Sequence, residues 1–104
     1  MNIEFGYFAT LPNKLCEDTN DVPVLGLQTC KEATKKLEHV PGVIFESSET
    51  LKNFPRGCFV HMGYQPNHVH FNMHIDGHRH RLAAQVCENR SRKLYYDTDF
   101  VHMS

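Results

Sequence analysis

The stretch NHVHFNMHIDGHRH, residues 67–80, alternates polar and apolar side chains along most of its length. From residue 68 to residue 76 every even-numbered side chain is polar and every odd-numbered one is apolar, the apolar set being Val69, Phe71, Met73 and Ile75. Successive side chains of a strand point to opposite faces of a sheet. This period of two therefore predicts a half-buried strand.

The residues that follow carry a turn signal. Asp76-Gly77 is typical of the tight turn between two paired strands. Residues 78–87 are therefore expected to return beside the first strand, with Leu82, Ala84 and Val86 facing one way.

Residues 29–40, further upstream, have the pattern of a short helix. Thr29, with Glu32 three positions later, is typical of a capping box at a helix start. An i, i+3, i+4, i+7 spacing places four side chains on one buried face: Cys30, Ala33, Thr34 and Leu37. Pro41-Gly42 is expected to end the helix.

The remaining segments complete the predicted fold. Strands are expected at Ile3, Phe5 and Tyr7, which alternate, and at residues 42–45, 58–62 and 94–101, with loops at 11–24 and 46–53. The fold class is α+β: an antiparallel sheet of about four to five strands with one short helix packed across it. The chain, residues 1–104, is expected to be a single disulfide-stabilised domain.

Composition argues against several functional classes. The net charge is −1 with the histidines neutral, whereas nucleic-acid-binding proteins are usually basic. The apolar runs are only a few residues long, far short of the roughly 18 that a membrane-spanning helix needs. The N-terminal MNIEFGYFAT has no basic start before an apolar run, so the chain is either cytosolic or a processed form whose leader is missing.

The four cysteines are widely spaced at Cys16, Cys30, Cys58 and Cys87. No CxxC pair occurs, which disfavours a zinc ribbon or a thioredoxin-type site. An even count permits two disulfides in three possible connectivities, and this suits a small protein of a secreted or lumenal, oxidising compartment. The alternative is four buried free thiols in the cytoplasm. Asn89-Arg90-Ser91 is a glycosylation sequon, which agrees with a secretory route.

Histidines gather in the quoted stretch and raise the question of a metal site. His68, His70 and His74 share one face of the predicted strand, where their imidazoles could converge on a transition metal such as zinc or copper. Asp76 could bind the ion or orient a ring. His61, or His78 and His80, could complete the set. The alternative is a polar, solvent-exposed strand face with no bound cofactor.

A set of residues between positions 16 and 89 forms a recognisable pattern: Thr29-Cys30 with Ala33, Pro55-Arg56-Gly57-Cys58-Phe59, Val69-His70-Phe71-Asn72 with His74 and Gly77, and Val86-Cys87. This pattern resembles a small cysteine-containing module of algal and other protist secretory proteins. The resemblance implies a disulfide-bound unit that binds or scaffolds and has no activity of its own. Within it Thr29, Gly57, Asn72 and Gly77 are expected to be structural, Asn72 by bonding the backbone of a neighbouring loop. The pairing most compatible with this layout joins Cys30 to Cys58 and Cys16 to Cys87.

Three functions follow as hypotheses. The first is a non-enzymatic, disulfide-stabilised binding or accessory module that works with a protein partner or in a larger assembly. The second is a small metalloprotein that uses the histidine strand. The third is a small cytosolic enzyme with free thiols.

Overall fold

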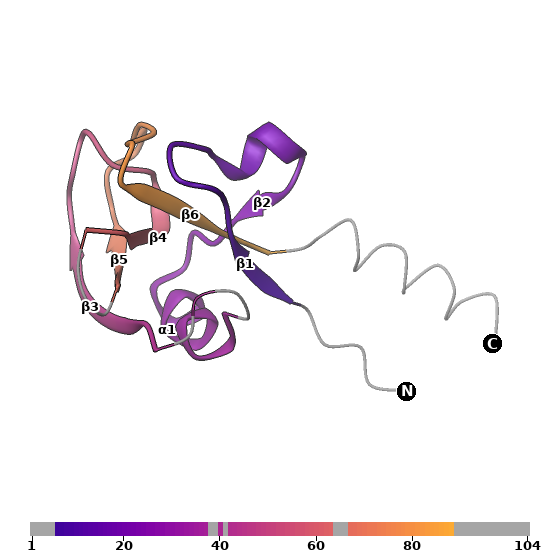
Figure 1. Ribbon diagram of the computed structural model, residues 1–104. Coiled ribbons are helices and arrows are strands. Elements are labelled where there is room, and N and C mark those ends of the chain that lie inside the picture. The colour runs from indigo at the N-terminus through magenta and orange to yellow at the C-terminus, as the bar shows by residue number, and fades with distance from the viewer. Residues whose placement is uncertain (1–5, 38–39, 41, 64–66, 89–104) are drawn as a thin grey trace, which may run out of the picture.

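Among the residues that the structure describes, six strands form one mixed sheet and a single α-helix packs on one of its faces (Figure 1). The computed structural model describes residues 6–37, 40, 42–63 and 67–88. The strands are β1 (Tyr7–Ala9), β2 (Val22–Pro23), β3 (Ile44–Glu49), β4 (Gly57–His61), β5 (His68–Asn72) and β6 (Ala83–Glu88). The helices are α1 (Leu27–Lys36) and the short 3-10 helix η1 (Cys16–Thr19).

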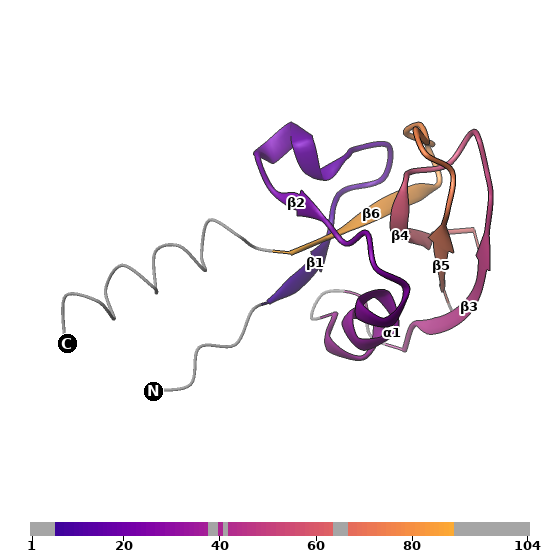
Figure 2. The ribbon, with the colours of Figure 1, turned by 180° about the vertical axis from the view of Figure 1, so that it is seen from behind.

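The strand order is β1-β6-β4-β5-β3, and β2 also pairs with β6. Figure 2, seen from behind, shows β3 at one side of the sheet and β1 and β2 at the other. All pairings are antiparallel except that of β3 with β5, which run parallel. The predicted α+β class is therefore confirmed, but the sheet is mixed and not purely antiparallel.

The predicted hairpin at Asp76-Gly77 is wrong. β5 pairs with β4 and β3, whereas β6 pairs with β4, so β4 lies between the two strands that were expected to be neighbours. β5 also ends at Asn72, and the next apolar side chains, Met73 and Ile75, are 57% and 75% exposed. Beyond the strand these two side chains line a surface pocket and do not reach the core.

The helix has the predicted buried face but a different start. α1 begins at Leu27, and its N-cap is Gly26, which makes no side-chain cap bond. Thr29 therefore lies inside the first turn, and the predicted capping box is wrong. The four predicted positions, Cys30, Ala33, Thr34 and Leu37, are all buried. Apolar spacing thus identified the packed face, while the capping signal placed the N-cap three residues too late, at Thr29 in place of Gly26.

The first half of the loop predicted at residues 46–53 forms part of a strand. Residues 46–49, expected in a polar loop, belong to β3 at the edge of the sheet. Ser47 and Glu49 are half-buried and contact His70, so polar contacts add to the packing of Phe45 against the core in this strand. Tyr7 lies in β1 as predicted, while residues 1–5 and the predicted strand at 94–101 lie outside the described residues.

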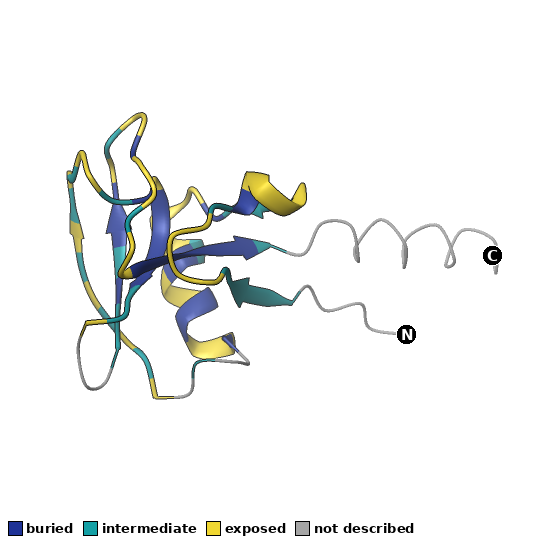
Figure 3. Ribbon diagram, turned by 45° about the horizontal axis from the view of Figure 1, so that its top comes forward, coloured by how far each residue is buried: buried dark blue, intermediate teal, exposed yellow. Residues whose placement is uncertain are grey.

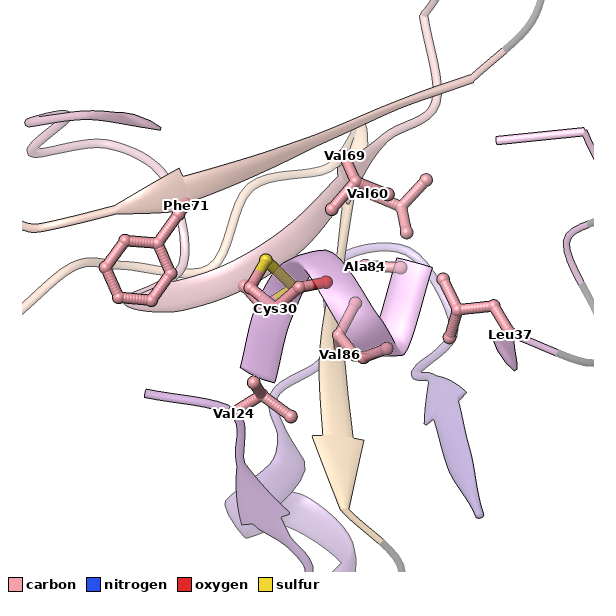
Figure 4. Close-up of a cluster of buried hydrophobic side chains, with 10 residues drawn as sticks. Val24, Cys30, Leu37, Val60, Val69, Phe71, Ala84 and Val86 are labelled. Atoms are coloured by element: carbon pink, nitrogen blue, oxygen red, sulfur yellow. A yellow bond between two sulfur atoms is a disulfide. The ribbon is translucent and has the colours of Figure 1, made fainter. Parts of the chain in front are cut away.

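A cluster of buried side chains fills the space between α1 and the sheet (Figure 4). Its members come from the helix, the strands and the segment before the helix: Val24, Cys30, Ala33, Leu37, Cys58, Val60, Val69, Phe71, Ala84 and Val86. Burying this apolar surface is the main term that favours folding. Figure 3 shows how burial differs between strands: β6 is buried along almost its whole length, whereas β3, at the edge of the sheet, is partly exposed.

Each face of the sheet is tied by its own disulfide. Cys30–Cys58 joins α1 to β4 on the helix side. Cys16–Cys87 joins η1 to β6, and because Cys87 alternates with the helix-facing Val86, it lies on the opposite side. These are the two pairs that the sequence layout predicted. Closing loops of 28 and 71 residues should each stabilise the fold by about 3 to 4.5 kcal/mol.

Candidate functional site

The side of the sheet turned away from α1 carries histidines and phenylalanines in place of aliphatic side chains. In β4, Cys58 and Val60 point to the helix, so Phe59 and His61 point away from it. Phe59 pairs with His70 of β5, and His61 pairs with His68. Two more rings, Phe54 and His80, come from the loops on this side. We call these six residues the histidine–aromatic face.

Four of the six rings form a continuous stack in the order His80, Phe54, Phe59 and His70, and the other two stand edge-on to it. Phe54 lies flat on His80 with centroids 4.2 Å apart and planes at 11°, and it stacks on Phe59 at 5.3 Å. Phe59 in turn stacks on His70 at 5.4 Å. His61 stands edge-on to Phe54 at 5.4 Å. Such stacked and edge-to-face pairs each add about 0.5 to 1.5 kcal/mol beyond area burial.

The four imidazoles of this face follow one another at short range. The ring centroids of His61 lie 6.3 Å from those of both His70 and His80, and His68 lies 6.4 Å from His70. Four protonatable groups are thus arranged in a line across β5, β4 and the segment before β6. Charge on one ring must therefore affect the others.

Burial keeps two of these rings neutral. The pKa of His70 is lowered first by burial and then by His68, against the opposing effect of Glu49. The pKa of His61 is lowered by burial and by the neighbouring His70 and His80. At neutral pH the centre of the face is therefore uncharged.

The edge strand β3 adds carboxylates and a hydroxyl to this face. Glu46 lies 3.8 Å from Nδ1 of His68, and Glu49 lies 3.9 Å from Nδ1 of His70. The Ser47 hydroxyl lies 3.3 Å from the same Nδ1 of His70 and donates to Glu49 at 3.3 Å. Ser47, Glu49 and His70 therefore form one polar contact between β3 and β5.

The predicted metal ligands separate into two places. His68 and His70 lie on the histidine–aromatic face. His74 lies beyond the end of β5, where its Nδ1 accepts hydrogen bonds from the backbone N–H of Asp76 and Gly77. Within the described ranges no group of three or more His, Cys, Asp or Glu residues is placed to hold a metal ion. Metal binding at His68, His70, His74 and Asp76 therefore stays a prediction.

The contribution of phenylalanine to this face was missed from the sequence. Phe59 was assigned to a strand, but the stacking of Phe54 on His80 joins residues from two loops. The only available signal was the high local density of aromatic and histidine residues. The distance in sequence between the two loops hid their contact in space.

Asn72 has the structural role that the sequence predicted. Its side chain is 1% exposed, and its Nδ2 donates to the carbonyls of Leu51, Phe54 and Pro55. Its Oδ1 accepts from the backbone N–H of Leu51 and His74. One amide thus fixes the loop that carries Phe54 against the end of β5.

Two glycines hold the neighbouring backbone in positions that a side chain would block. Gly57 has a φ of +78°, and a Cβ there would meet the carbonyl oxygen of Val24. Gly77 has a φ of +60°, and a Cβ there would collide with the backbone at Arg56 and lie 2.8 Å from the carbonyl oxygen of Phe54. Both conformations favour glycine.

The predicted glycosylation sequon cannot be placed in the same way, because Asn89 lies outside the described residues.

A second surface feature lies where β5 ends. A pocket of about 320 Å³ is lined on its apolar side by four side chains: Leu25, Phe71, Met73 and Ile75. Arg56 and His74 form part of its polar lining. Leu25, Met73 and Ile75 are 44%, 57% and 75% exposed, which is unusual for three large apolar side chains around one pocket. We call this feature the Ile75 pocket.

No family model, no curated protein and no solved structure matches this chain. Among the described residues no helix is long and apolar enough to cross a membrane.

Proposed function

We propose that this chain is a non-enzymatic, disulfide-stabilised binding or accessory module of an oxidising compartment, and that it works as part of a larger protein assembly. The observation that carries this proposal is the use of all four cysteines in two disulfides, one on each side of the sheet. Disulfides of this kind form and persist outside the reducing cytosol.

The same observation weighs against the enzyme hypothesis. That hypothesis needs a free thiol, and the chain has no free cysteine. With both bridges closed the chain has no cysteine nucleophile, which favours a binding role over the enzyme with free thiols.

The Ile75 pocket is the surface best suited to a protein partner. Leu25, Met73 and Ile75 present apolar area that folding leaves uncovered, and Arg56 supplies a charge at the rim. Arg56 is exposed, and no ion pair or side-chain hydrogen bond of its guanidinium occurs among the described residues. Apolar centres with an arginine at hand are typical of protein–protein contacts.

The test is the native size of the chain in the cells that make it. A tagged copy is isolated by its tag under non-reducing conditions, and its complexes are weighed by native mass spectrometry. We expect a defined complex larger than the 12.1 kDa chain. The double variant Met73→Ser/Ile75→Ser should dissociate from that complex while keeping the melting temperature of the parent, because both side chains are exposed.

Leu11→Ser is the matched control, since Leu11 is 74% exposed but lies outside the Ile75 pocket. It should leave the complex intact. A parent chain that is monomeric in its own cells would overturn the proposal. So would a complex that survives the double variant as well as it survives the control, because the surface argument would then have failed.

A further inference from the structure

The contacts of the histidine–aromatic face favour unprotonated histidine side chains. Phe54 and Phe59 lie against His80 and His70 in stacked geometry, and His61 lies edge-on to Phe54 and close to both His70 and His80. Nδ1 of His80 accepts a hydrogen bond of 3.0 Å from the backbone N–H of Leu82, a role that is open only to an unprotonated nitrogen. Protonation would therefore disturb both the stack and the turn that leads into β6.

Charged and titratable groups reach this face from every element around it. β3 contributes Glu46 beside His68 and Glu49 beside His70. β4 contributes His61, β5 contributes His68 and His70, and the segment before β6 contributes His80. Both carboxylates lie on the β3 side, so they can offset charge on β5, and Glu49 partly opposes the lowering of the pKa of His61. Among the described residues no carboxylate forms an ion pair with His80.

Acid therefore brings like charges together at the end of the face that is far from β3. Protonated His61 would lie 6.3 Å from a protonated His80 and equally close to His70. In addition, His61 and His70 would have to hold their charge partly out of water. Separating Phe54 and His80 from the sheet relieves both costs, because it readmits water to the rings.

We propose that the histidine–aromatic face is an acid-sensitive latch: protonation of its histidines releases residues 50–56 and 78–82 from the sheet, while the helix side stays closed by Cys30–Cys58. This inference goes beyond the proposed function and does not depend on a partner. The two released segments touch each other through the Phe54–His80 stack and the hydrogen bond from His78 N–H to the Phe54 carbonyl, so they open together. Opening also breaks the hydrogen bonds from the Asn72 amide to the loop of Phe54.

The sign of the pH effect follows from the lowered pKa of His61 and His70. A histidine whose pKa is lower in the folded state binds fewer protons there than in the open state. Its contribution to stability is complete above the ordinary histidine pKa and is lost as the pH falls through the lower, folded value. The latch therefore opens as the pH falls below about 6.5.

The test compares amide hydrogen exchange at pH 7.5 and pH 5.5, with rates corrected for the intrinsic effect of pH. The probes of the latch are the amides of His78 and Leu82, which bond to Phe54 and His80. The probes of the helix side are the amides of Cys30 and Cys58, which bond to Gly26 and Val24. We expect protection to fall at pH 5.5 by about tenfold or more for the first pair, and by much less for the second.

Two variants show whether the histidines cause the change. His61→Gln removes the ring that contacts both Phe54 and His80, and it should abolish most of the difference between the two pH values. His70→Gln should do the same and serves if His61→Gln does not fold. His78→Gln is the control, because His78 is an exposed histidine of the same segment outside the stack, and it should behave as the parent does.

Three results would overturn the latch. Equal loss of protection on both sides of the sheet would mean ordinary acid unfolding. An unchanged pattern between the two pH values would mean that the stack tolerates protonation. A parent-like acid response in both His61→Gln and His70→Gln would assign the effect to other groups.

Discussion

The two faces of the sheet are made by alternate residues of the same strands, yet they are built from different chemistry. In β4, Val60 is fully buried against α1, while its neighbour His61 faces the other way and keeps some exposure. In β5, Val69 is likewise buried in the apolar cluster, while the next residue, His70, faces the other way and keeps some exposure. One face is held by apolar burial, which pH does not affect, and the other by rings that acid can charge.

This difference assigns separate tasks to the two faces. The helix face supplies most of the stability, because it buries the apolar cluster and closes it with Cys30–Cys58. The histidine–aromatic face has polar and titratable groups where a second apolar layer would be more stable. Such a cost is expected where side chains serve recognition or regulation.

Among the variants described below, the largest effect is expected from loss of Cys30–Cys58, the disulfide on the helix face. The double variant Cys30→Ser/Cys58→Ser removes one bridge without leaving a free thiol, and it should cost about 3 to 4 kcal/mol of unfolding free energy. Thermal unfolding monitored by circular dichroism measures this. A melting temperature equal to that of the parent would mean that the bridge contributes no stability.

Asn72→Ala should follow, because it breaks the link between β5 and the Phe54 loop. The change leaves the carbonyls of Leu51, Phe54 and Pro55 without their shared donor. We expect a loss of about 2 to 3 kcal/mol in urea unfolding, since buried groups lose their partners. Asn53→Ala, an exposed asparagine in the same loop, is the control and should unfold with the parent.

Val60→Ala and His61→Ala compare the two faces at adjacent positions of one strand. Val60→Ala opens a void in the apolar cluster and should cost about 2 kcal/mol at neutral pH. His61→Ala removes a partly exposed ring and should cost about 1 kcal/mol or less, because water can fill the space. If His61→Ala proved the more damaging in chemical denaturation, the assignment of stability to the helix face would be wrong.

Arg79→Gln should have the smallest effect. Arg79 pairs with Asp18 at 2.7 Å on the surface, where water and salt screen the attraction. We expect the melting temperature to stay within the error of the parent value in 150 mM salt. A clear decrease would show that this pair anchors the segment around η1 more strongly than its exposure indicates.

The parts of the fold that follow from periodicity could be predicted from the sequence. Val69 and Phe71 alternate with polar residues and are buried, and the helical spacing of Cys30, Ala33 and Leu37 marks the face that packs. These patterns report local geometry, which depends only on neighbours in the chain. The cysteine pairing followed from placing those elements against one another.

The parts that depend on long-range pairing could not be predicted. Asp76-Gly77 has the sequence of a hairpin turn, but β4 takes the place beside β5, and Gly77 serves a close approach to the backbone at Arg56 instead. His74 shares the polar phase of His68 and His70, but β5 ends before it at Asn72. Period alone does not say where a strand stops, and the predicted metal group depended on that boundary.

Intact mass, followed by disulfide mapping, tests the central claim most directly. The protein is purified without a metal-affinity step, and its denatured mass is compared before and after reduction. We predict a mass about 4 Da below the reduced value, because each disulfide removes two hydrogens, with linked peptides for Cys30–Cys58 and Cys16–Cys87. A denatured mass equal to that of the fully reduced chain, with one metal ion bound in the native spectrum, would contradict the account. It would support metal binding by the histidine strand instead.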